Sequence, residues 1–173
     1  MMHYILSELK TVFEELPLNA VEDTARVIQD HDRIFVCAAG RSGLMLRALA
    51  MRLAQMGRTV YVVGETVTPA IGEGDLLILA SASGTTHSTC HYARSAQEAG
   101  ARVFVITSKT DSPLAKIADT HIVLHTASKD STAGSRQIMG SLFEQALLLF
   151  GDMVVHSLPY HASAMRKRHA NLE

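Results

Sequence analysis

The chain has 173 residues, a length that fits one domain of ordinary size. Hydrophobic residues make up 47% of it and charged residues 19%, a balance that excludes a disordered chain, a collagen and a coiled-coil rod. The formal net charge of -1 gives no electrostatic reason to expect nucleic acid or an anionic membrane as a partner.

Residues 2–30 carry apolar side chains at helical spacing on both sides of Pro17, which predicts two helices or one kinked helix. Beyond them, short continuous apolar runs alternate with helical stretches. The runs predict buried strands, four clear and the last one weaker, at 33–39, 59–63, 75–81, 102–107 and 121–125. The stretches between them predict helices at 42–56, 86–99 and 111–118.

The C-terminal part begins with residues 126–136, which are rich in Ser, Thr, Ala and Gly and predict a mobile loop. A long apolar helix is expected at about 137–158, followed by a polar tail at 160–173. Buried strands that alternate with helices are typical of a parallel sheet covered on both faces. We therefore predict an α/β fold, a three-layer α/β/α sandwich with a doubly wound, five-stranded parallel sheet, in a single domain.

Two loops that follow predicted strands are candidates for a binding site, because ligands of open parallel sheets bind beyond the carboxyl ends of the strands. The first, Ala38 to Gly43, resembles a degraded dinucleotide fingerprint, with Glu65 where a ribose-binding acid could stand. The second, Ser81 to Thr86, offers hydroxyls and free N–H groups at a helix start. Two such loops favour a single phosphate held from both sides, and so a phosphomonoester. The alternative is that these Ser and Thr side chains only cap helices.

Glu144 interrupts a helix that is otherwise dominated by Leu, Phe and Ala. A carboxylate in such surroundings loses solvent and becomes a stronger base, as an enolising enzyme requires. The alternative is a buried structural ion pair with one of three arginines, namely Arg41, Arg47 or Arg52.

Histidines and cysteines point to no metal site. His87 and His91 share one helix face, but no third ligand can be named, so no metal is predicted. Cys37 and Cys90 lack the CxxC spacing of a zinc knuckle and form no disulfide framework, which favours a reducing, cytoplasmic setting. No leader pattern and no apolar run of about 18 residues indicate secretion or a membrane span.

The second loop matches the pattern SxSGxT, through Ser81, Ser83, Gly84 and Thr86, and thereby resembles the sugar isomerase (SIS) domain family. Four further strings resemble the 6-phospho-3-hexuloisomerase branch of that family: Ala39 to Gly43, Ala50 to Leu53, Gly64 to Pro69 and His169 to Glu173. The loop departs from the family in Thr85, where many members carry Glu, and in Ala82, where many carry Gly.

The resemblance implies an intramolecular oxidoreductase of the aldose–ketose isomerase type. Its reaction would interconvert 3-hexulose 6-phosphate and fructose 6-phosphate, the step after formaldehyde fixation in the ribulose monophosphate pathway, by proton transfer through an enediolate without a cofactor. A homotetramer is also implied. Two alternatives remain open: an SIS-type sensor that binds a phosphosugar without turnover, and another aldose–ketose phosphosugar isomerase. Sensors are usually fused to a DNA-binding domain, for which 173 residues leave no room.

The resemblance also implies roles for individual residues. The phosphate would be held by Ser42, Ser81, Ser83 and Thr86. The sugar would contact Gly40, Gly84 and Glu65. Glu144 would be the base, His169 a proton shuttle between oxygens and Arg41 a stabiliser of developing negative charge. The basic tail around His169 would act in its own subunit or in a neighbour's.

Overall fold

The computed structural model describes residues 2–127 and 135–171. Its five strands form one sheet in the order β2-β1-β3-β4-β5, and every neighbouring pair is parallel. The strands are β1 (Arg33–Ala38), β2 (Thr59–Val62), β3 (Leu76–Ser81), β4 (Arg102–Thr107) and β5 (Thr120–Val123). The predicted parallel sheet is thereby confirmed.

The central strands are largely apolar because both faces of the sheet are covered. In β3 all six residues are buried; Ile78 faces one hydrophobic cluster, whereas Leu77 and Leu79 face another on the opposite side. This alternation within a continuous apolar run is typical of a central strand in a three-layer sandwich.

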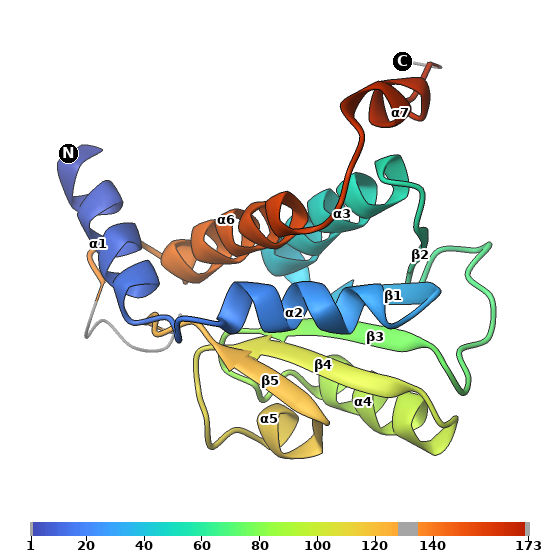
Figure 1. Cartoon of the computed structure of the whole chain (residues 1–173). Helices are drawn as coiled ribbons and strands as arrows, with labels where there is room; N and C mark the ends of the chain where they lie inside the picture. Colours follow the sequence, from blue (N-terminus) through green and yellow to red (C-terminus); the bar gives the residue numbers. More distant parts are fainter. Residues whose placement is uncertain (1, 128–134, 172–173) are drawn as a thin grey trace.

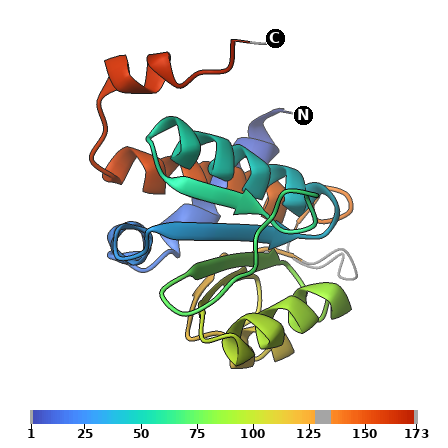
Figure 2. The same ribbon diagram turned by 90° about the vertical axis from the view of Figure 1, so that its right-hand side faces the viewer.

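Helices cover the two faces unequally, as Figures 1 and 2 show. One face carries four helices: α1 (Met2–Glu14), α2 (Ala20–Gln29), α3 (Gly40–Gln55) and α6 (Ser141–Ser157). The other face carries α4 (His87–Glu98) and the short α5 (Pro113–Ile117). The tail forms one more helix, α7 (Ala162–Lys167), which buries none of its residues. Within the described residues, no helix is long and apolar enough to cross a membrane.

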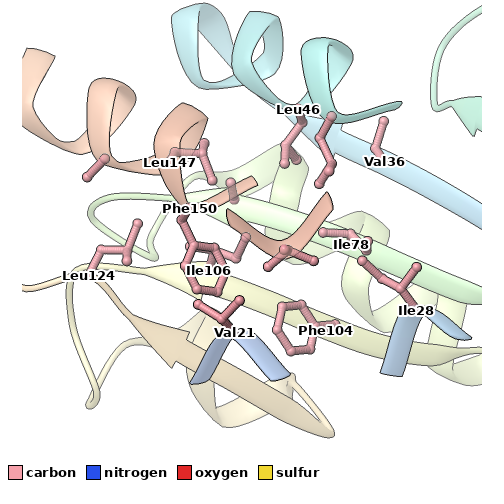
Figure 3. Packing of buried hydrophobic residues seen from close by; sticks show 14 of the residues in the cluster. Val21, Ile28, Val36, Leu46, Ile78, Phe104, Ile106, Leu124, Leu147 and Phe150 are labelled. Atoms are coloured by element: carbon pink, nitrogen blue, oxygen red, sulfur yellow. The ribbon is translucent and has the colours of Figure 1, made fainter. Parts of the chain in front are cut away.

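The larger core lies between the sheet and the four-helix layer (Figure 3). Phe104 of β4 and Phe150 of α6 are each 1% exposed, and Ile28 of α2, in the same cluster, is fully buried. α6 packs against α1, α2 and α3 and thus lies at the centre of this layer. Burial of so many large side chains fixes the first turn of α6 relative to the strand ends.

At the amino ends of the strands, Arg33 of β1 is bound to Asp75, which precedes β3. The guanidinium donates from Nε at 2.8 Å and from Nη2 at 2.5 Å, and the Gly72 N–H donates to the same carboxylate at 2.7 Å. Burial opposes ionisation of Asp75, but these hydrogen bonds and the arginine's charge outweigh it, so the pKa of Asp75 is lower than usual. The Arg33–Asp75 pair connects two central strands at the end of the sheet opposite the candidate site.

The predicted elements differ from the observed ones mainly before the last long helix. α6 begins at Ser141, four residues later than predicted, because Met139 and Gly140 have φ values of 54° and 79°. Left-handed residues cannot stand in the interior of a right-handed helix, so the helix starts beyond them. Most of the loop predicted at 126–136, namely residues 128–134, lies outside the described part of the chain.

Candidate active site

A cavity lies at the point where the chain reverses its direction across the sheet. From β1 the chain moves outward to β2 and then returns to β3 on the other side, so the carboxyl ends of β1 and β3 flank a topological switch point. The cavity there encloses about 290 Å³, close to the lower end of the range for ligand pockets of about 300–1,000 Å³. Its walls come from the loop after β1, the loop after β3 and the start of α6.

The loop after β1 brings its backbone to the cavity by a tight turn into α3. Gly40 has a φ of +60°, and Ala39 caps the helix without a side-chain hydrogen bond. A Cβ at Gly43 would lie 2.5 Å from the Ala38 carbonyl oxygen, so this turn requires glycine. Ala39, Gly40, Arg41 and Ser42 all line the cavity, with the first N–H groups of α3 beside them.

The loop after β3 is held together by its own hydroxyl groups. Ser81 Oγ accepts a hydrogen bond from the Gly84 N–H at 3.2 Å and shares another with Thr86 Oγ1 at 3.0 Å. Ser83 Oγ accepts from the Thr85 N–H at 3.3 Å and from the Thr85 hydroxyl at 3.0 Å. These bonds leave the hydroxyl proton of Ser83 free to donate to a ligand in the cavity, and that of Thr86 is free as well when Ser81 is the donor in the bond between them.

Gly84 shapes this loop from behind. Its φ is +64°, and a Cβ there would lie 2.2 Å from Ser112 Oγ. Its carbonyl oxygen accepts a hydrogen bond from the Leu114 N–H at 3.0 Å, which fastens the loop to the start of α5. Gly84 is therefore a structural residue of the loop and does not line the cavity.

The third wall is the start of α6, where Gly140 is the N-cap and takes no side-chain cap. Three helices, α3, α4 and α6, thus begin at the cavity, and none of them has a side-chain cap. By contrast, α5 begins elsewhere and is capped by Ser112 Oγ. Free N–H groups and the positive ends of three helix dipoles favour an anion at this place.

Glu144 lies in the first turn of α6 and faces the loop after β1. Its Oε2 is 2.7 Å from Arg41 Nε; the Glu144 side chain is 12% exposed and that of Arg41 is 64% exposed. The N–H of Arg41 is not aligned with Oε2, which has no hydrogen-bond partner within the described residues. Glu144 is therefore a nearly buried carboxylate whose counter-ion is at the surface and free to turn away.

This ion pair shows which of the three arginines considered from the sequence is the partner of Glu144. Arg47 is bound to Glu65 at 2.5 Å, and Arg52 donates to Gln55 Oε1 at 2.9 Å. Arg41 is thus the partner of Glu144. The predicted base and the predicted stabiliser of negative charge form one pair.

Seven of the predicted site residues line the one cavity: Gly40, Arg41, Ser42, Ser81, Ser83, Thr86 and Glu144. Three do not. Gly84 lies behind the loop, and Glu65 follows β2 and is paired with Arg47 outside the cavity.

The third, His169, follows α7, and α7 lies beside the C-terminal end of α3 (Figure 1). Its neighbour Arg168 donates to the Gln55 carbonyl oxygen at 3.5 Å, at the C-terminus of a helix whose N-terminus lies at the cavity. The 16 residues of α3 span about 24 Å. The structure does not bring His169 to the cavity of its own chain.

From the sequence we assigned no site role to Met139, Gly140 and Phe143, although all three line the cavity. A glycine directly before a long apolar helix was the available signal, since glycine supplies the left-handed φ of this cap. In the described ranges, no three His, Cys, Asp or Glu side chains are grouped as metal ligands would be. The prediction that the site needs no metal stays a prediction.

Comparisons with known proteins agree with this architecture. A family model described as SIS domain matches residues 27–149. The chain is 48% identical to a 3-hexulose-6-phosphate isomerase of Mycobacterium gastri over 86% of this chain and 78% of that one. It is 40% identical to a 3-hexulose-6-phosphate isomerase of Bacillus subtilis over 98% and 95%.

Among solved structures, one from Methanococcus jannaschii superimposes with a TM-score of 0.84 at 30% identity. The match covers 99% of this chain and 98% of that one. A molecular function of 3-hexulose-6-phosphate isomerase was inferred for that protein.

Proposed function

The chain belongs to the SIS domain family, and we propose that it is a phosphosugar isomerase that interconverts 3-hexulose 6-phosphate and fructose 6-phosphate. The observation that carries this proposal is the nearly buried carboxylate of Glu144 across one cavity from a hydroxyl-lined anion cradle. The names of the two bacterial relatives supply the identity of the substrate.

The phosphate group binds where the three helices begin. Ser83 and Thr86 from one side and Ser42 from the other donate hydrogen bonds to its oxygens, together with backbone N–H groups near Gly40, while Ser81 supports Thr86 through the hydrogen bond of 3.0 Å between their hydroxyls. Charge-assisted bonds of this kind fix the ligand and direct its sugar carbons toward α6.

Glu144 moves the proton. In 3-hexulose 6-phosphate the carbonyl is at C3, and the carboxylate removes the proton from C2, so that an enediolate spans C2 and C3. Return of the proton to C3 leaves the carbonyl at C2, which is fructose 6-phosphate. The proton between the two oxygens moves in the same interval, and His169 is the proposed carrier.

Arg41 has two successive roles in this scheme. Before the substrate binds, it balances the charge of Glu144 at 2.7 Å. Because its side chain is 64% exposed, it can turn from the carboxylate to the enediolate oxygens, where its charge stabilises the intermediate and Glu144 is freed to accept the proton.

The tail and the assembly belong to the same proposal. We propose a homotetramer in which His169 reaches the cavity of a neighbouring subunit, and Glu65 orients substrate hydroxyls at the rim. Leu149 and Met153, spaced by four on the outer side of α6, are exposed and support such an interface. Residues 1–173 then act as one SIS domain with added N-terminal helices and tail.

A cytoplasmic setting is supported by two free cysteines, Cys37 and Cys90. Burial, which outweighs the nearby charge of Arg47, raises the pKa of the Cys37 thiol, so this side chain stays protonated and unreactive.

The test is solvent exchange of fructose 6-phosphate in deuterium oxide, followed by proton NMR. A base that works between C2 and C3 exchanges the hydrogen on C3, and its signal disappears. Exchange on C1 would instead identify another aldose–ketose isomerase. Tight binding without exchange at either carbon would identify a sensor, and both outcomes would contradict the proposal.

A further inference from the structure

The turn that leads into α6 has a backbone that must be held in place. Met139 is the one non-glycine residue with a positive φ among the described residues, and Gly140 beside it is also left-handed. Such a conformation is unfavourable for a residue with a Cβ and persists only when its surroundings hold it. Both residues line the cavity, and Glu144 follows within one helical turn.

On its C-terminal side this turn is fixed by α6 itself. The Ser141 N–H donates to the Ile138 carbonyl oxygen at 3.0 Å, and the Ser141 hydroxyl donates to the same oxygen at 2.8 Å. The first turn of α6 is part of the large core through Leu142 and Phe143, which are 3% and 0% exposed. These contacts fix only the C-terminal side of the turn, and its N-terminal side is held by a second anchor.

That anchor is a single carboxylate from the other end of the chain, Glu8 of α1. Glu8 Oε1 accepts a hydrogen bond from the Arg136 N–H at 2.7 Å. Its Oε2 accepts from Ser135 Oγ at 2.8 Å and from Gln137 Nε2 at 3.0 Å. Both oxygens are used, and all three donors belong to the residues directly before the turn.

Two further contacts hold this arrangement. The Arg136 guanidinium lies 4.5 Å from the centre of the Tyr4 ring, one helical turn before Glu8 on α1. α1 itself packs against α6, and Figure 1 shows it beside the chain that enters α6. Burial opposes ionisation of Glu8, but the three hydrogen bonds and the charge of Arg136 outweigh it, so the pKa of Glu8 is lower than usual.

We propose that Glu8 is a positioning residue of the active site. Its carboxylate anchors residues 135–137, so that Met139 and Gly140 keep their left-handed conformation and the cavity wall next to Glu144 stays in place. The kinetic part of this inference rests on the proposed isomerase function; the anchoring of the turn does not. Glu8 lines neither the cavity nor the phosphate-binding loop at 81–86. It therefore affects catalysis only by holding the turn at Met139 and Gly140 in place.

The test is Glu8→Gln. Glutamine has the same size, but it offers one oxygen acceptor instead of two and turns an NH₂ group toward donors. The control is Glu14→Gln, which removes the same charge from the same helix, where Glu14 forms a surface ion pair with Lys10.

In Glu8→Gln, we expect backbone hydrogen exchange across 137–141 to become faster by about 10-fold or more. We also expect kcat to fall by about 10-fold or more, because a small displacement of the cavity wall next to Glu144 misaligns the base with the substrate. KM should change by less than about threefold, because the phosphate loop at 81–86 is untouched. Glu14→Gln should match the wild type in all three.

A second pair of variants keeps the inference testable if Glu8→Gln loosens α1 as a whole. Ser135→Ala removes one of the donors without altering α1 and should lower kcat in the same direction by a smaller factor. Combined with Glu8→Gln it should add nothing further, because both changes break the same contact.

Unchanged exchange across 137–141 in Glu8→Gln would overturn the inference, and so would faster exchange with an unchanged kcat. If the wild type turned over no phosphosugar while exchange still became faster in Glu8→Gln, the proposed function would be wrong and the anchoring would stand. The two failures are therefore distinguishable.

Discussion

Ser81 illustrates how one side chain both shapes the site and prepares it for a ligand. Its hydroxyl accepts from the Gly84 N–H and shares a hydrogen bond with Thr86. When Ser81 is the donor in that bond, a chain of polarised donors runs from the loop's backbone to Thr86 at the cavity. Such a relay strengthens the last donor. A phosphate oxygen is the acceptor that completes it.

The hydroxyls of Ser83 and Thr86 are therefore expected to control substrate binding. Ser83→Ala and Thr86→Val each remove one donor to a dianion, a bond of about 1.5–3 kcal/mol, so KM should rise roughly 10- to 100-fold. Steady-state kinetics measure this effect. Ser157→Ala, at the far end of α6, is the control. A KM unchanged in both loop variants would place the phosphate elsewhere.

At the scale of single residues, the sequence identified most polar groups of the cavity, but it left the partner of Glu144 open among three arginines and did not indicate Glu8. Ser81, Ser83 and Thr86 could be selected because they directly follow an apolar strand, and strand ends converge in any parallel sheet. The pairing of Glu144 with Arg41, and that of Glu8 with residues 135–137, joins segments more than 100 residues apart. No local spacing encodes such contacts.

At the scale of elements, the helix boundaries that shape the candidate site are those where a left-handed glycine stands at the start of the helix. α3 and α6 both begin at a left-handed glycine, Gly40 or Gly140, and both begin at the cavity. The periodicity of apolar residues predicted both helices. It placed the start of α6 four residues early because a hydrophobic pattern does not report the sign of φ.

A substitution at Gly84 tests how rigidly the loop after β3 is held. Gly84→Ala should lower the free energy of unfolding by about 2–4 kcal/mol, because the new methyl meets Ser112 Oγ at 2.2 Å in addition to the cost of a left-handed residue. Gly64→Ala is the matched control: its φ is +94°, with nothing within 4 Å of the added Cβ, and it should cost only about 1 kcal/mol.

Urea unfolding of the two variants measures the difference. Equal losses would mean that the contact with Ser112 relaxes without cost and that the loop is not held as tightly as described.

Across the whole molecule, the sheet order brings together three helix starts that are distant in sequence, and the tail is carried away from them. The sheet could be predicted because its central strands are covered on both faces, which leaves a continuous run of apolar residues in β1, β3 and β4. The position of the tail could not, because α7 buries none of its residues and no pattern fixes a surface helix.

The proposed assembly predicts complementation between subunits. Glu144→Gln and His169→Asn should each be inactive alone, and mixed oligomers should regain partial activity, because some cavities combine an intact Glu144 with a neighbour's intact His169. Sedimentation of the wild type should give a species close to four times 18.8 kDa. A single species of 18.8 kDa would contradict the assembly, and failure to complement would contradict the shared site.

The central claim is that Glu144 moves a proton between C2 and C3 of a bound hexose phosphate. The measurement that tests it most directly is the rate at which the C3 hydrogen of fructose 6-phosphate exchanges with deuterium oxide in Glu144→Gln and in the wild type. Glu73→Gln, which alters an exposed carboxylate between β2 and β3, is the control. We predict a loss of about 10²–10⁴-fold in Glu144→Gln with the fold intact, and no change in Glu73→Gln. Exchange at the wild-type rate in Glu144→Gln would contradict the account and leave Glu144 as the partner of Arg41 alone.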